Sequence, residues 1–222
     1  DGRPLFNPGP FDWPDWMTRT MRLGEQIGQE TFRVPAADSQ ASTALVRAIR
    51  LRGGDTIAYE EHVEVPVCDG ALQADPACDI LKAIVFERHH ASGTHAAGFV
   101  CGLGIHGAFA QTVAHDAHNL LVVGDNDADM ALAANALVEC GGGAVAVVDG
   151  EIVAKVALGV CGLMSTGEVS EVASQVLRMQ QAWADMGCKM PSPFMTLGLL
   201  SLACIPELRL TNRGYVDCTQ FK

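Results

Sequence analysis

Residues 80–87 read Ile-Leu-Lys-Ala-Ile-Val-Phe-Glu, and this run decides the fold class. The run is short, almost entirely apolar and rich in β-branched residues, which predicts a buried strand. Apolar or alternating runs of similar length lie on both sides of it. We expect further strands at residues 45–51, 56–66, 97–101, 109–114, 120–124, 144–148, 152–156 and 214–218.

Three helices are expected in the second half of the chain. Asn126 or Asp127 caps the first, which runs to about residue 139 and ends at the glycines 141–143. A capping box at residues 165–168 starts the second, which runs to residue 187, and Ser192-Pro193 opens the third, which stops before Pro206. Strands and helices do not alternate regularly, so we predict an α+β fold with a mixed, largely antiparallel sheet flanked by helices.

Composition excludes several classes of protein. Of 222 residues, 49% are hydrophobic and 18% are charged, which excludes intrinsic disorder. The formal net charge of −11 argues against a nucleic-acid partner, and no apolar run reaches the roughly 18 residues of a membrane span. Eight cysteines without Cys-x-x-Cys or zinc-finger spacing indicate reduced thiols in a cytoplasmic protein.

The first 36 residues differ from the rest of the chain. Four prolines there alternate with Phe6, Phe11, Trp13 and Trp16, which is typical of an extended, polyproline-like connector laid over a hydrophobic surface. That surface belongs either to this domain or to a part of the protein outside the sequence. We therefore expect a connector at residues 1–36 and a folded domain at residues 37–222.

All seven histidines fall between residues 62 and 118, and the densest group is His115-Asp116-Ala117-His118-Asn119, hereafter the histidine segment. Histidine titrates near neutrality, and Asp116 can orient an imidazole, so the segment is a candidate catalytic site. The alternative is a polar corner that joins two strands. Two histidines three residues apart have no evident third ligand, so we expect no metal site here.

Residues 102–107 read Gly-Leu-Gly-Ile-His-Gly and match the dinucleotide-binding pattern. That pattern requires a helix starting at the glycines, whereas residues 108–119 contain mostly weak helix formers. A dinucleotide-binding module is therefore the least favoured alternative.

Three blocks of the sequence resemble the C-terminal domain of bacterial adenine deaminases, which belong to the amidohydrolase superfamily. They are residues 80–90, residues 113–119 with the Val-Val-Gly and Asn-Asp that follow, and residues 193–197 through 205–211. The blocks recur in the family's order and spacing. The resemblance implies a domain without the (β/α)8 barrel, which would precede it and carry a manganese or iron centre, so this chain alone would bind no metal and be inactive.

The resemblance also implies a reaction and roles for individual residues. The family hydrolyses adenine to hypoxanthine and ammonia, and this part would cover and complete the active site. It implies catalytic roles for His115, Asp116, His118 and Asn119, and substrate contacts for the residues of a neighbouring loop: His89, His90 and Ser92. Adjacent strand residues point to opposite faces, so at most one of the two paired histidines is expected to join the catalytic group.

Several alternatives stay open. Residues 91–94 read Ala-Ser-Gly-Thr where the family usually has Gly-Thr-Gly-Asn, so another cyclic amidine or amide could replace adenine as the substrate. The domain could instead be a non-catalytic part that serves assembly or oligomerisation. The expected partners are the barrel part of the same enzyme, a purine and further copies of the chain in a homo-oligomer, without nucleic acid or membrane.

Overall fold

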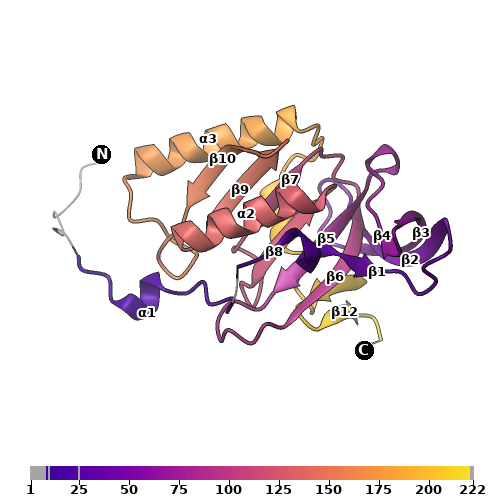
Figure 1. The fold of residues 1–222 in the computed structure, drawn as a ribbon. Helices are drawn as coiled ribbons and strands as arrows, with labels where there is room; N and C mark the ends of the chain where they lie inside the picture. Colours follow the sequence, from indigo (N-terminus) through magenta and orange to yellow (C-terminus); the bar gives the residue numbers. More distant parts are fainter. Residues whose placement is uncertain (1–8, 10, 25, 221–222) are drawn as a thin grey trace.

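A computed structural model describes residues 9, 11–24 and 26–220. In this part of the chain, ten strands form one sheet in the order β1-β4-β3-β2-β6-β5-β8-β7-β9-β10, and β11 and β12 form a separate hairpin (Figure 1). Every pairing between described strands is antiparallel except that of β2 with β6. The predicted α+β fold with a largely antiparallel sheet is confirmed.

The elements have the following bounds. The strands are β1 Val34–Pro35, β2 Thr43–Arg50, β3 Tyr59–Cys68, β4 Ala71–Leu72, β5 Ile80–Phe86, β6 His95–Cys101, β7 Ala108–Gln111, β8 Leu120–Gly124, β9 Gly143–Val148, β10 Glu151–Ala157, β11 Leu208–Thr211 and β12 Gly214–Asp217. The helices are α1 Asp15–Thr18, α2 Asp127–Cys140, α3 Val169–Asp185 and α4 Pro193–Gly198, with 3₁₀ turns η1 Gln29–Phe32 and η2 Pro76–Cys78.

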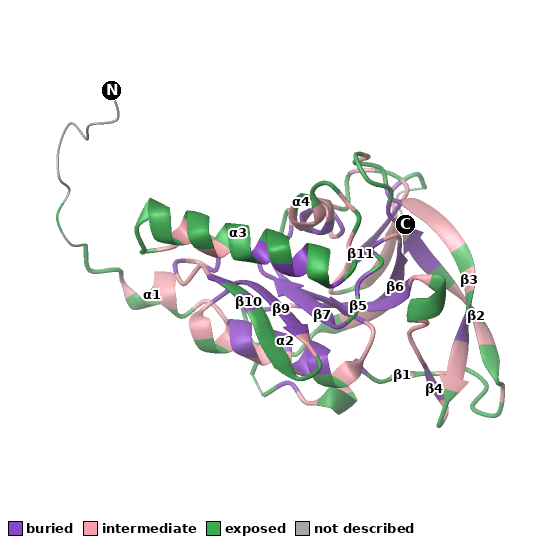
Figure 2. Ribbon diagram, turned by 90° about the horizontal axis from the view of Figure 1, so that it is seen from above, coloured by how far each residue is buried: buried purple, intermediate pink, exposed green. Residues whose placement is uncertain are grey.

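Strand β5 lies near the middle of the sheet, and all seven of its residues are buried. Leu81, Ala83 and Val85 pack into one core with α3, α4 and β11, whereas Ile84 and Phe86 pack into another with α2 and η1. Figure 2 shows α3 and α2 on opposite sides of the sheet. A strand covered on both faces has no polar alternation, which explains why residues 80–86 are almost continuously apolar.

The helix α2 forms as expected. The side chain of Asn126 accepts a hydrogen bond from the Asp129 amide at 2.8 Å, and Gly141 ends the helix with a φ of 83°. Gly143 already belongs to β9, and the hairpin of β9 and β10 turns at Asp149 and Gly150, as predicted.

Two predictions about the C-terminal half are wrong, and one strand was missed. The capping box does not form: α3 begins at Val169 after Glu168, without a side-chain cap. Helix α4 ends at Gly198 instead of running to residue 205, and carbonyls of the residues that follow bind the buried Arg209. The strand β11 was not expected, and it pairs with β12, the expected last strand.

The connector is only partly extended. It contains α1, η1 and β1, and Ile27 and Phe32 are buried in the core below α2. Phe11 and Trp16 are 65% and 66% exposed, so the described start of the chain extends away from the domain (Figure 1). Phe6 lies outside the described residues. The boundary at residue 36 stays a prediction.

The glycine pattern of residues 102–107 leads into strand β7, not into a helix. The amides of Gly102 and Gly104 donate to the carboxylate of Asp79 at 2.8 and 2.7 Å, so they are not free to bind a pyrophosphate. The structure therefore lacks the helix that a dinucleotide site of this kind requires.

Candidate functional site

The sheet brings two loops to the same edge. Phe86, the last residue of β5, pairs with Leu120, the first of β8, and Gln111 at the end of β7 pairs with Leu121. The loop of residues 87–94 after β5 and the histidine segment between β7 and β8 therefore lie beside each other. Antiparallel pairing produces this proximity, although the segments are about 30 residues apart in the sequence.

The histidine segment is a turn at the surface of the domain. Asp116 is exposed, His115 and His118 are half-buried, and Asn119 is 4% exposed. The His115 amide donates to the Gly198 carbonyl at 2.7 Å, and the His118 amide donates to Ala114 at 2.7 Å. The segment is thus anchored at both histidines while its carboxylate stays accessible.

The two imidazoles of the segment lie close together. The ring centroids of His115 and His118 are 5.1 Å apart, and the rings are tilted by 65°. Burial, together with the nearby imidazole of His115 and the positive charge of Arg88, lowers the pKa of His118 below its ordinary value. Nδ1 of His118 is buried and has no hydrogen-bond partner among the described residues. The direction of this shift favours the neutral imidazole of His118, the form that can accept a proton.

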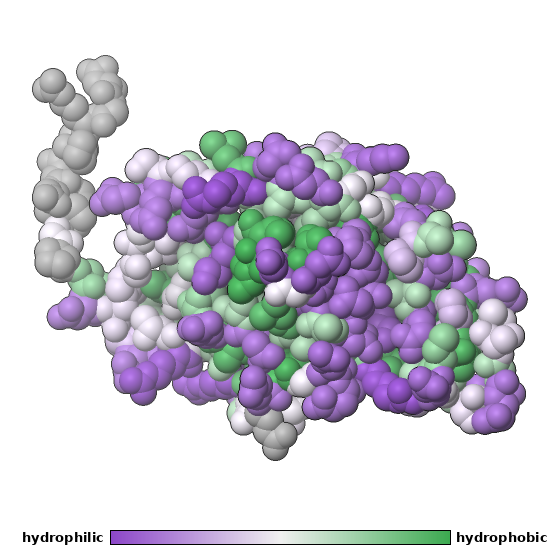
Figure 3. Space-filling view, turned by 45° about the horizontal axis from the view of Figure 1, so that its top comes forward, coloured by the Kyte–Doolittle hydropathy of each residue, from purple (hydrophilic) through white to green (hydrophobic). Residues whose placement is uncertain are grey.

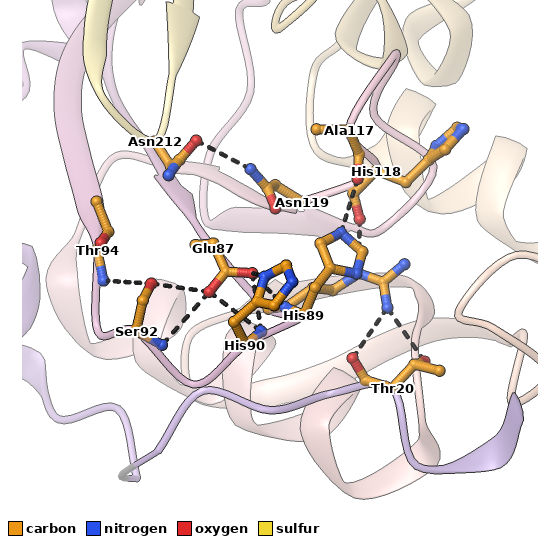
Figure 4. Close-up of polar contacts among 11 residues, drawn as sticks. Thr20, Glu87, His89, His90, Ser92, Thr94, Ala117, His118, Asn119 and Asn212 are labelled. Carbon is orange, nitrogen blue, oxygen red and sulfur yellow. Dashed lines mark hydrogen bonds and ion pairs between the residues drawn. The ribbon is translucent and has the colours of Figure 1, made fainter. Parts of the chain in front are cut away.

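Asn119 joins the segment to the C-terminal hairpin. Its amide donates to the side-chain oxygen of Asn212, between β11 and β12, at 3.2 Å (Figure 4). Its own oxygen is buried without a partner in the described part of the chain. Asn119 therefore acts as an anchor inside the domain, whereas Asp116 is exposed and His115 and His118 are partly accessible.

Of the two paired histidines, one contacts the segment. Nε2 of His89 lies 2.7 Å from the Ala117 carbonyl (Figure 4). The side chain of His90 is 83% exposed, and its Nδ1 lies 3.2 Å from Glu87. The expectation that at most one of them joins the segment fits this geometry, and its role in substrate binding stays a prediction.

Glu87 organises the loop that contains Ser92. Its carboxylate accepts hydrogen bonds from the amides of His89 and His90, at 2.5 and 3.0 Å, and from the Ser92 hydroxyl at 2.8 Å. Partial burial opposes ionisation, but the hydrogen bonds from Ser92, His89 and His90 outweigh it and lower the pKa of Glu87 to about 2. His90 and Ser92 are thus bound to Glu87 and not to the histidine segment.

Arg88 and the His106 cluster were missed by the sequence reasoning. Arg88 is 1% exposed and donates to the His118 carbonyl at 2.6 Å. At the other end of β7, His106 lies 2.7 Å from Asp125 and 3.3 Å from Asp149, which raises the pKa of His106. The only sequence signal for Arg88 is a charged residue directly after a buried strand.

The described residues do not form a metal site. They contain no group of three or more histidine, cysteine, aspartate or glutamate side chains placed to hold an ion. His115 and His118 supply at most two nearby nitrogens, below the three protein ligands of a typical catalytic site. The metal that the resemblance implies would be held by a barrel outside this chain, so its presence in the enzyme stays a prediction.

Comparison with known proteins gives the same family as the sequence blocks. The family model described as the adenine deaminase C-terminal domain matches residues 55–222. The chain belongs to the adenine deaminase C-terminal domain family. Adenine deaminases of Clostridium botulinum strain ATCC 19397 and Moorella thermoacetica are 51% and 46% identical to it, over 96% and 100% of this chain. The adenine deaminase of Rubrobacter xylanophilus is 40% identical over 97%.

The chain spans 35–37% of the length of these adenine deaminases. Both the 87–94 loop and the histidine segment lie within the residues that match the adenine deaminase C-terminal domain. None of the helices in the described residues is long and apolar enough to cross a membrane.

Proposed function

We propose that this chain is the C-terminal domain of an enzyme that hydrolyses adenine to hypoxanthine and ammonia. In this reaction water adds to C6 of the purine, the C6–N6 bond breaks, and ammonia leaves with the proton that water supplies. The proposal is supported by relatives named adenine deaminase that are 40–51% identical over nearly the whole chain.

Within that enzyme, we assign the histidine segment to the wall of the active site. The observation that carries this assignment is the exposed Asp116 beside the half-buried His118, whose lowered pKa favours the neutral imidazole, on a turn anchored at both histidines. A carboxylate such as Asp116 can accept hydrogen bonds from the N–H groups of adenine. A neutral imidazole such as His118 can accept or return a proton near neutral pH.

The metal and the remaining active-site groups belong to another part of the enzyme in this proposal. A manganese or iron ion would be held by a barrel that precedes the domain and would supply an activated water. The domain alone would then be inactive. We further propose that the enzyme is cytoplasmic and forms a homo-oligomer. We also propose that it belongs to the amidohydrolase superfamily and acts in purine metabolism.

The proposed substrates include other cyclic amidines or amides as alternatives to adenine. Ser92 and Thr94 line a cavity of about 440 Å³ with Glu87 and His95, next to the connector residues 23–31. The 87–94 loop departs from the usual family sequence at residues 91–94, so it is the place where this protein's specificity would differ from that of its relatives.

The test uses the full-length enzyme. We expect His115→Ala and Asp116→Ala to lower kcat for adenine by about 100-fold, since positioned acid–base groups contribute factors of that order. Folding and metal content should match those of the unchanged enzyme. His62→Ala is the control, because His62 is a surface histidine that lies on β3, away from the segment. Wild-type kcat in both variants would remove the segment from the active site.

A second candidate function, assembly, is favoured by one observation. Helix α3 exposes Val169, Val176 and Leu177, which are 85%, 41% and 64% accessible. If the domain serves assembly alone, Leu177→Ser should reduce the oligomer size, while the His115 and Asp116 variants should retain full turnover per folded enzyme. Sedimentation and kinetics on the same samples separate the two candidates.

A further inference from the structure

Arg88 is a buried cation without an acidic partner. Its side chain is 1% exposed, and no carboxylate among the described residues lies within ion-pair distance of it. The carboxylate of the adjacent Glu87 is directed to its own loop. Burial lowers the pKa of Arg88 to about 10, so the guanidinium remains charged at neutral pH. A buried unpaired charge destabilises a fold unless hydrogen bonds compensate it.

The compensation comes from three separate segments. Nε donates to the His118 carbonyl at 2.6 Å, and Nη2 donates to the Cys161 carbonyl at 2.9 Å. Nη1 donates to the carbonyl and hydroxyl of Thr20 at 3.2 and 3.1 Å (Figure 4). One side chain therefore joins the histidine segment to the connector and to the loop between β10 and α3.

The surroundings fit a guanidinium closely. A Cβ atom at Gly162 would lie 2.8 Å from Nη2 of Arg88, so a larger residue there would displace the guanidinium from its present place. The planar guanidinium donates in three directions at once, which a lysine ammonium on a flexible stem cannot reproduce here. The site is therefore built for arginine rather than for any cation.

Two neighbouring carbonyls of the histidine segment are both contacted by residues of the 87–94 loop. His89 contacts the Ala117 oxygen at 2.7 Å, and Arg88 binds the next oxygen, that of His118. His118 has a φ of 50°, a left-handed conformation that is unfavourable for a residue with a side chain. External hydrogen bonds are what retain such a conformation.

We propose that Arg88 is a positioning residue of the active site: it holds the histidine segment in its working conformation and couples it to the connector at Thr20. Its catalytic consequence rests on the function proposed above. Its structural consequence, the order of the segment, can be measured without any turnover.

The experiment compares Arg88→Met and Arg88→Lys in the full-length enzyme, with Lys82→Met as the control. Lys82 is also 1% exposed and lies on β5, the strand that leads into the 87–94 loop, but it binds Asp127 and the Phe32 carbonyl. In Arg88→Met we expect amide exchange at residues 115–119 to rise about tenfold or more as local opening becomes easier. We expect kcat to fall about 100-fold with little change in KM, since misplacement of about 1 Å has that effect.

The pH profile gives a readout that loss of stability alone would not change. The groups that face His118 are His115, His89, Asp116 and Arg88, and the Arg88 charge lowers the pKa of His118. Its removal in Arg88→Met should move the acid limb of the kcat profile to higher pH. Arg88→Lys keeps the charge, so it should leave that limb in place and recover part of kcat.

The outcomes separate this inference from the proposed function. Unchanged exchange at residues 115–119 in Arg88→Met would overturn the inference and leave the proposed function standing. Faster exchange with wild-type kcat would confirm that Arg88 orders the segment and would contradict the catalytic role of the segment itself. In Lys82→Met, exchange at residues 115–119 should stay as in the unchanged enzyme, and a rise there equal to that in Arg88→Met would also overturn the inference.

Discussion

Glu87 is the residue whose ionisation most directly controls the shape of the candidate site. Its carboxylate receives three backbone amides and the Ser92 hydroxyl, and it also contacts the His90 ring. These donors favour the charged form, and the pKa falls from the ordinary 4.5 to about 2. A carboxylate with a lowered folded pKa stabilises the native state above its unfolded pKa and loses that effect as the pH falls toward the folded value.

We predict that Glu87→Gln removes this pH dependence. Above pH 4.5 the wild-type chain should be more stable than the variant, by at most about 3 kcal/mol at roughly 1.4 kcal/mol per pH unit. The difference should shrink between pH 4.5 and 2. Urea unfolding of both proteins over this range measures it. A difference that stays constant with pH would show that Glu87 has an ordinary pKa.

The sequence identified the histidines more readily than the groups that hold them. Histidines stand out because all seven lie in one part of the chain. Arg88 does not, because its partners His118, Thr20 and Cys161 are 30, 68 and 73 residues away. Contacts between residues so far apart in the sequence depend on the register in which the strands pair. The local sequence of a loop does not determine that register.

At the scale of elements, α2 and α3 show why one cap could be predicted and another could not. Asn126 caps α2 as its sequence suggests. The Ser165 hydroxyl instead accepts from the Gly167 amide, and α3 begins later, at Val169. Serine binds a turn amide two residues ahead as readily as a helix terminus. The four-residue pattern alone does not distinguish these outcomes.

We predict that the two caps differ in their effect on stability. Asn126→Ala should lower the free energy of unfolding by about 1 kcal/mol, because the Asp129 amide loses its acceptor. Ser165→Ala should change it by less than about 0.5 kcal/mol, as for an exposed residue without a cap. Urea unfolding compares them directly. Equal losses in the two variants would contradict the assignment of the caps.

The early end of α4 is also accompanied by contacts from outside the helix. Residues 199–206 are apolar enough to continue a helix, but Arg209 takes the carbonyls of Leu199, Ile205 and Pro206. Gly198 also packs closely against Val113, where a Cβ atom would lie 3.2 Å from the carbonyl oxygen. The carbonyls that follow this helix therefore bind a buried arginine on β11, and these contacts become visible only in the fold.

At the scale of the whole molecule, local sequence patterns predicted a largely antiparallel sheet flanked by helices, and they predicted α2. They did not predict which residues come together in the candidate site. The face in Figure 3 shows hydrophobic side chains near its middle among hydrophilic neighbours. The exposed large hydrophobic residues on β10 and α3 are Ile152, Val153, Val169, Val176 and Leu177. Such patches mark surfaces that other parts of a protein or its partners cover. This fits a domain that spans 35–37% of its relatives' length.

The central claim is that the histidine segment faces the purine in the complete enzyme. Photolabelling of the full-length protein with 8-azidoadenine, followed by peptide mapping, tests it most directly. We predict label on the peptide that contains His115 and Asp116, and its loss when excess adenine is present. Adenine-protected label found solely on peptides without the histidine segment would contradict the account.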